Sequence, residues 1–112
     1  MIIAVGLGSV SEAADPADIK DQLARGRNLF EAGNLERAIA VFESVDSLAP
    51  GTPSVHQLLL TAYRYLGIDY YGQSRCEEAV AVWRKALALD PENRELPRYI
   101  HRCETELSGI AR

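Results

Sequence analysis

The residues able to do chemistry are few, and their spacing favours none of the common reactions. His56 and His101 lie far apart in the sequence, and neither has a cysteine or carboxylate neighbour at the short spacing of a metal site. Cys76 and Cys103 form no C-x-x-C pair, and neither lies in a recognisable nucleophile motif. The sequence therefore predicts no catalytic residue, no metal site and no cofactor, which indicates a protein that is not an enzyme.

The N-terminal segment, residues 1–14, is open to two interpretations. Its apolar run MIIAVGLGSV followed by SEAA resembles a secretory signal with a small-residue cleavage region, but no basic residue precedes it. Export and a cytoplasmic location both stay open. The same run contains a G-x-G, yet Ser11 stands where a dinucleotide fingerprint has its third glycine, and no βαβ unit follows. A nucleotide-binding enzyme is therefore a remote alternative, which tight nucleotide binding would revive.

Length and charge narrow the class of protein. The chain has 112 residues, a length that fits one compact domain, and 47% of them are hydrophobic. The net charge is −4, which favours neither nucleic acid nor an anionic membrane surface as a partner. The apolar run at the start is about ten residues long, half of what a membrane-spanning helix needs. We expect no stable membrane span.

Prolines, glycines and capping residues divide the chain into helices. Asp15 and Thr52, each followed by proline, Asn34, and the pair Ser74-x-x-Glu77 are typical of helix starts, the last as a capping box. Gly33 is expected to end the first helix. The predicted helices cover about 15–32, 34–48, 52–71, 74–89 and 94–108. Five helices with short connections predict an all-α protein.

The chain repeats one pattern after 41 residues. Ala38 corresponds to Ala79, Phe42 to Trp83, and Pro50 to Pro91. The second copy resembles the tetratricopeptide repeat family, in which a W-x-x-L-G-x-x-Y helix is followed by an A-x-x-x-F helix and a proline. The positions that carry the resemblance are Tyr63, Leu66, Gly67, Tyr70, Ala79, Trp83, Ala86 and Pro91. In the first copy Gln22 and Arg25 replace the usual large apolar residues.

The resemblance implies a right-handed solenoid of two α-α hairpins and a C-terminal capping helix. Repeat one covers about 19–52, repeat two about 53–93, and the capping helix about 94–108. Seven residues more than the family's period of about 34 lie in the first helix of repeat two, which we expect to be lengthened by about two turns. The apolar stripe of Leu96, Ile100, Cys103 and Leu107 suits a terminal helix with one wet face.

The resemblance also implies function: a protein-protein interaction module that binds a partner peptide or helix in a concave groove. The family's groove-facing positions correspond here to Lys20, Leu23, Arg27, Phe30, Arg64, Ile68, Tyr71, Arg98 and Arg102, with Glu31, Thr61, Gly72, Glu95, Thr105 and Glu106 beside them. Arginines beside apolar residues with nothing to pack on in the monomer favour an acidic, partly apolar ligand. Leu23 and Arg27 replace the lysine and asparagine with which some members clamp a C-terminal carboxylate.

Two alternatives stay open. The groove face could be covered by the N-terminal segment or a second copy, so the protein could be an assembly subunit that self-associates through its edges or its long helix. In the repeat geometry, Cys76 and Cys103 are expected to be neighbours, because adjacent helices run antiparallel. They could form a disulfide if the protein is exported, or remain two half-buried thiols if it is not.

Overall fold

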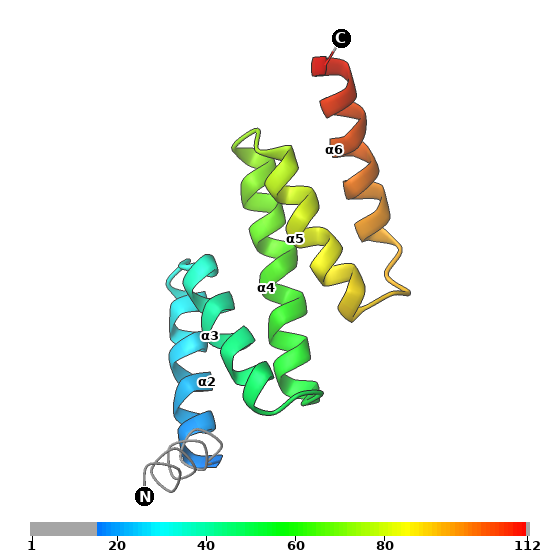
Figure 1. The fold of residues 1–112 in the computed structure, drawn as a ribbon. Helices are drawn as coiled ribbons and strands as arrows, with labels where there is room; N and C mark the ends of the chain where they lie inside the picture. The colour runs from blue at the N-terminus through cyan, green and yellow to red at the C-terminus, as the bar shows by residue number, and fades with distance from the viewer. Residues whose placement is uncertain (1–15, 112) are drawn as a thin grey trace, which may run out of the picture. The chain divides into compact units, whose positions relative to one another are not determined.

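The computed structural model describes residues 16–111, which form five helices and no strand (Figure 1). These are α2 (Pro16–Glu31), α3 (Leu35–Leu48), α4 (Pro53–Gly72), α5 (Cys76–Leu89) and α6 (Glu95–Ala111). The all-α prediction, with two helical hairpins and a last single helix, is confirmed. The chain divides into two compact units, Met1–Val55 and His56–Arg112, and each is described by itself. The predictions for residues 1–14 lie outside the described residues.

The first hairpin is α2 and α3, held together by a small residue facing a large one. Gly26 lies against the ring of Phe42, where a side chain of any size would collide with the ring. Phe42 is fully buried, together with Ala38 and Val45 on the same face of α3. The buried residues of α3 recur every three or four positions, as an amphipathic helix requires. Burial of this stripe is what fixes α3 on α2.

The turn between α2 and α3 is repeated between α4 and α5. In the first turn the Asn34 N–H donates to the Leu29 carbonyl at 2.9 Å, and Gly33 has a φ of +86°. In the second the Arg75 N–H donates to the Tyr70 carbonyl at 2.8 Å, and Ser74 has a φ of +61°. Both are Schellman turns, in which a left-handed residue follows the helix and satisfies its last carbonyls.

The predicted capping box at Ser74-x-x-Glu77 is therefore wrong. Helix α5 begins at Cys76, its N-cap position is Arg75, and no side chain caps it. Ser74 belongs to the turn that ends α4, because the Schellman geometry requires a residue in the left-handed region at this position. Asn34 is the N-cap of α3 as predicted, but its side chain makes no capping hydrogen bond.

The second hairpin, α4 and α5, repeats the close approach with a larger ring. Gly67 lies against the indole of Trp83, which is 3% exposed. The Trp83 Nε1–H donates to the carbonyl of Arg64 at 3.3 Å, so the buried indole nitrogen is satisfied. Helix α4 has 20 residues against 16 in α2, so the first helix of the second copy is longer, but by about one turn rather than the two turns expected. Trp83 thereby joins the two helices by packing and by a hydrogen bond.

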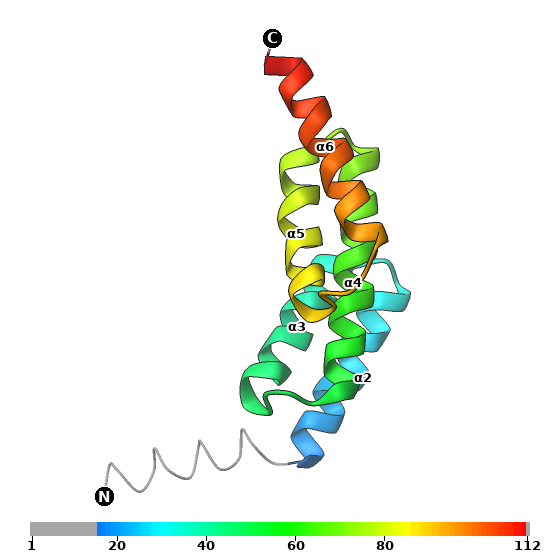
Figure 2. The same cartoon turned by 90° about the vertical axis from the view of Figure 1, so that its right-hand side faces the viewer.

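Helix α6 lies beside α5 in both views (Figures 1 and 2). Its buried face is Leu96, Ile100 and Cys103, while Leu107, the fourth residue of the expected stripe, is half-buried. The Asn93 side-chain oxygen accepts hydrogen bonds from the N–H groups of Glu95 and Leu96, each at 2.9 Å. This cap fixes the start of α6, which ends at Ala111 rather than near Ser108. None of the helices in the described residues is long and apolar enough to cross a bilayer.

Candidate functional site

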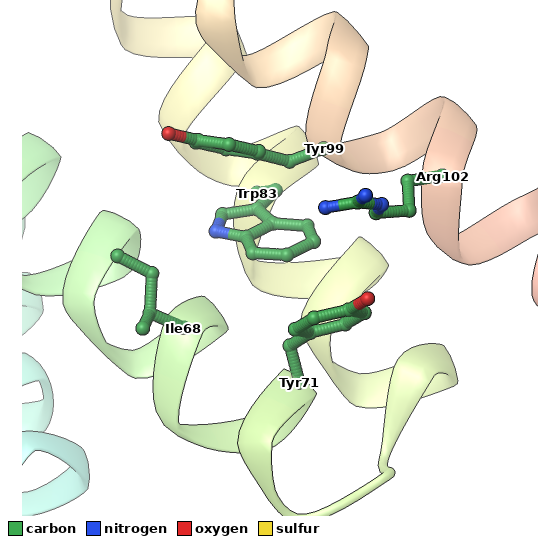
Figure 3. A pocket seen from close by; sticks show the side chains of 5 residues that line it. All are labelled: Ile68, Tyr71, Trp83, Tyr99 and Arg102. Carbon is green, nitrogen blue, oxygen red and sulfur yellow. The ribbon is translucent and has the colours of Figure 1, made fainter.

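Two tyrosine rings of the His56–Arg112 unit pack on Trp83. The Trp83 and Tyr99 ring centroids are 5.4 Å apart, and those of Trp83 and Tyr71 are 6.3 Å apart. Both pairs are tilted, an arrangement that aromatic quadrupoles favour. Figure 3 shows the indole between the two tyrosines, with Tyr71 coming from α4 and Tyr99 from α6. Trp83 is thus the centre on which three helices meet.

These rings form the wall of an open cavity of about 270 Å³, here called the aromatic cavity. Its lining residues are Ile68, Tyr71, Trp83, Tyr99 and Arg102 (Figure 3). Ile68 is 49% exposed, so it offers apolar surface to a ligand as well as to the cavity wall. Binding sites for small molecules usually measure about 300–1,000 Å³. A cavity at the lower edge of that range fits one side chain of a partner better than a whole cofactor.

The charge at the cavity comes from Arg102. This residue is exposed, and within residues 16–111 its guanidinium has no ion pair or hydrogen bond. Figure 3 shows the guanidinium reaching from α6 toward the indole. Arg64 differs, because its Nη2 lies 3.4 Å from Oε1 of Glu95. Of these two predicted groove residues, Arg102 is therefore the one whose charge is available to pair with a ligand carboxylate.

A hydrogen-bonded chain leads away from the cavity. The Tyr71 hydroxyl donates to Oε1 of Glu106 at 2.9 Å, and the Cys76 thiol donates to Oε2 of the same carboxylate at 3.5 Å. The hydrogen bond to Glu106 raises the pKa of Tyr71 above its ordinary value, because the carboxylate stabilises the protonated phenol. Tyr71 therefore packs on Trp83 and bonds to Glu106, which corrects the expectation that it packs nothing in the monomer.

The predicted groove residues fall into two groups. Ile68, Tyr71 and Arg102 line the aromatic cavity, while Arg98 is exposed elsewhere on α6. The α2 residues belong to the Met1–Val55 unit, where Lys20 and Arg27 are exposed and Leu23 and Phe30 are half-buried. Their part in binding stays a prediction.

Two cavity residues were not predicted as site residues. Trp83 was assigned to the core, which is correct, but its indole also forms the cavity wall. Tyr99 was not singled out. It lies three residues before Arg102 on α6, and residues three apart share one face of a helix. The spacing of Tyr99 from Arg102, a predicted binding residue, was therefore the signal in the sequence that could have identified Tyr99 as a site residue.

Nothing in the described part of the chain gathers into a metal centre. Within residues 16–111, no group of three or more histidine, cysteine, aspartate or glutamate side chains is arranged so that it could hold a metal ion. His56 is half-buried and His101 is exposed on α6. The aromatic cavity brings together aromatic rings and one arginine, side chains that suit recognition of a ligand.

Comparison with known proteins agrees with the resemblance seen in the sequence. Residues 61–93 match the tetratricopeptide repeat family, and this segment covers most of α4, all of α5 and the turn that follows. The family assignment is therefore confirmed on the second hairpin. A search of curated proteins finds no significant match. Tetratricopeptide repeats are in general non-catalytic modules of protein-protein interaction, and proteins are the expected partners.

Proposed function

We propose that this member of the tetratricopeptide repeat family binds an acidic, partly apolar peptide or helix of a partner protein at the aromatic cavity. One apolar side chain of the partner enters between Tyr71 and Tyr99, against Trp83. A neighbouring carboxylate of the partner pairs with Arg102. The observation that supports this most is an open aromatic wall beside a guanidinium that has no ion pair among the described residues.

The physical argument combines burial and charge. Aromatic walls supply large contact areas at little entropic cost, and such residues dominate the binding energy of protein interfaces. An arginine holds a carboxylate in a two-pronged geometry, and it does so more strongly where water is partly excluded. A basic ligand would face Arg102 and Arg98 with like charge. An acidic ligand with one large apolar residue satisfies both the ring surface and the arginine.

The other predicted anchors have secondary parts. Arg98 is exposed and adds positive charge along α6, while Arg64 has to exchange Glu95 for a ligand carboxylate before it contributes. Lys20, Leu23, Arg27 and Phe30 on α2 are proposed only as a continuation of the peptide-binding surface, carried over from the family pattern.

A peptide titration tests the proposal before any natural partner is identified. Trp83 is the single tryptophan, so its fluorescence reports on the cavity. The probe is a blocked synthetic peptide with one phenylalanine between glutamates. Matched peptides with alanine for the phenylalanine, or lysines for the glutamates, are the controls. We expect saturable quenching or enhancement with the first peptide and at least a tenfold weaker effect with both controls, about 1.4 kcal/mol or more.

Two charge reversals complete the test. Arg102→Glu should weaken binding of the acidic peptide about tenfold or more and reduce its salt dependence. Arg94→Glu makes the same charge change on an exposed residue outside the cavity, and it should leave the affinity close to that of the parent. Equal affinities for the parent and the Arg102→Glu variant would remove the cavity as the binding site.

Self-association is the competing use of the same surface. Light scattering on the parent protein distinguishes the two. If the chain forms a stable dimer that the acidic peptide cannot dissociate, and Ile68→Ser abolishes that dimer, the exposed Ile68 face is an interface between copies and the peptide proposal fails.

A further inference from the structure

The cavity is connected to two cysteines that the binding proposal does not use. We propose that Cys76 and Cys103 are a redox-active pair that oxidises to an intramolecular disulfide, and that this modification is transmitted to the aromatic cavity through Glu106 and Tyr71. The inference stands apart from the proposed function, because it concerns the state of the chain itself and needs no ligand.

The first argument is the position of the two sulfurs. Cys76 is the first residue of α5, and Cys103 lies on the buried face of α6, the helix packed beside it. Both thiols are free in the structure, with exposed fractions of 7% for Cys76 and 0% for Cys103. Burial first, and then the neighbouring Cys76 thiol, raise the pKa of Cys103, which is consistent with two thiols that lie near each other. Glu106, which accepts the Cys76 thiol at 3.5 Å, lies about one helical turn after Cys103 on α6, so the two thiols lie at the same level of adjacent helices, as an intramolecular disulfide requires.

The second argument is the shared carboxylate. Oε2 of Glu106 accepts the Cys76 thiol at 3.5 Å, and its Oε1 accepts the Tyr71 hydroxyl at 2.9 Å. A disulfide has no S–H to donate, so oxidation takes one of these two donors away from Glu106. Its carboxylate is exposed and reorients easily. Tyr71 lines the cavity and packs near Trp83. A movement of the Glu106 carboxylate therefore alters the hydrogen bond of a residue that belongs to the binding surface.

The reaction needs an oxidant, and a peroxide is the class we assign. The sulfur of Cys76, the more exposed of the two residues, attacks one peroxide oxygen, which forms a sulfenic acid and releases water from hydrogen peroxide. Cys103 then displaces the sulfenic hydroxyl as a second water, and the S–S bond forms. Two thiols lose two electrons and two protons, and one hydrogen peroxide becomes two waters. Burial, together with Cys76 and Glu106 nearby, raises the pKa of Cys103 to about 12, so this thiol keeps its proton until the sulfenic acid is adjacent.

The test on the full chain begins with disulfide formation. The reduced protein is treated with stoichiometric hydrogen peroxide, unfolded, alkylated with iodoacetamide and weighed by mass spectrometry. We expect a monomer that has lost two hydrogens and takes up no alkyl group, while Cys76→Ser and Cys103→Ser each form no intramolecular bond. A product that is only an intermolecular dimer, or only a sulfinic acid, overturns the proposal. The parent alone, before and after oxidation, gives this answer even if a variant fails to fold.

The second arm tests the connection to the cavity. Trp83 emission is recorded for the reduced and the oxidised parent, and for the same two states of Tyr71→Phe, which keeps the ring but removes the hydroxyl bonded to Glu106. We expect a shift of the emission on oxidation of the parent and a much smaller shift in Tyr71→Phe. An unchanged emission in the oxidised parent, or an equal shift in both proteins, overturns the transmission through Glu106 and Tyr71. Neither readout depends on peptide binding, so this inference and the proposed function can fail separately.

Discussion

The two hairpins have the same plan and differ in what they present to solvent. Each places a glycine of its first helix against an aromatic ring of its second, Gly26 with Phe42 and Gly67 with Trp83. Each ends its second helix in nearly the same backbone conformation, with φ and ψ of −136° and 73° at Ala49 and −138° and 74° at Asp90. The repeat in the sequence is therefore a repeat of backbone geometry, carried by a few small and large residues.

The difference lies at two positions of the first helix. In the second hairpin Leu66 and Tyr70 are buried, whereas the corresponding Arg25 is exposed and Leu29 is half-buried. In the first hairpin these two residues, with Asn28 and Arg37, line a shallow open space of about 330 Å³ instead of a packed contact. The same backbone thus carries a solvent-exposed polar face in the first copy and an apolar core in the second. Side-chain type at these two positions, and not hairpin geometry, decides which copy packs an apolar core there.

The largest expected effect is the loss of an aromatic centre. Trp83→Ala should lower the free energy of unfolding by about 3–5 kcal/mol, because it removes a buried ring and leaves a cavity. Phe42→Ala should fall in the same range but at its lower end, since Phe42 donates no hydrogen bond while Trp83 donates one to Arg64. Urea unfolding followed by circular dichroism measures both. Unfolding curves that overlay the parent would contradict the packing described for the hairpins.

Substitution of the glycines that face these rings is expected to give the next largest loss of stability, and a different loss in each hairpin. Gly67→Ala should cost about 1–3 kcal/mol, because the added methyl group collides with the indole nitrogen side of Trp83. Gly26→Ala should cost less within that range, because the methyl group meets only the edge of the Phe42 ring. Gly72→Ala is the control, since nothing lies near its position. It should be neutral or slightly stabilising in thermal melts. Equal costs at Gly67 and Gly72 would contradict the close approach.

The Schellman turns give a smaller, opposite pair of effects. Ser74→Gly should stabilise the protein by about 1 kcal/mol, because serine adopts a left-handed conformation that glycine reaches without strain. Gly33→Ser should destabilise it by a similar amount for the same reason. Thermal denaturation of the two single variants and the double variant checks this. The double variant is expected near the parent, since the two changes have opposite effects of similar size.

The smallest effect on stability at neutral pH is expected from Cys103, one of the two cysteines of the second unit. The pKa of Cys103 is raised from 9.0 to about 12, so the folded thiol keeps its proton where the unfolded one has released it. This contribution to stability is complete below pH 9 and is lost as the pH rises toward 12. Under reducing conditions, Cys103→Ala should flatten that alkaline decline in urea unfolding. Tyr71→Phe is measured alongside, because the raised pKa of Tyr71 acts in the same direction.

Local sequence signals predicted the helices because those signals act within one turn of the chain. Pro53 at the first position of α4 and Gly33 after α2 have their effect through their own φ angles, whatever packs around them. Gly67 and Trp83 were both recognised in the sequence as positions of the repeat, and the structure places one against the other. The amino-acid sequence by itself therefore determined the fold class, the helix order and most helix ends.

The site needed distances between residues far apart in the chain. Tyr99 becomes a cavity residue only because α6 brings it to 5.4 Å from Trp83, and Arg64 is less available than Arg102 only because Glu95 lies within 3.4 Å. Ser74 resembled a cap in the sequence, yet the turn after α4 holds it in a left-handed conformation. The tertiary structure alone decided these features, because ion pairs, ring contacts and shared carboxylates depend on helix packing. Sequence spacing within one helix shows which residues share a face, as Tyr99 and Arg102 do, but not which residues of another helix that face meets.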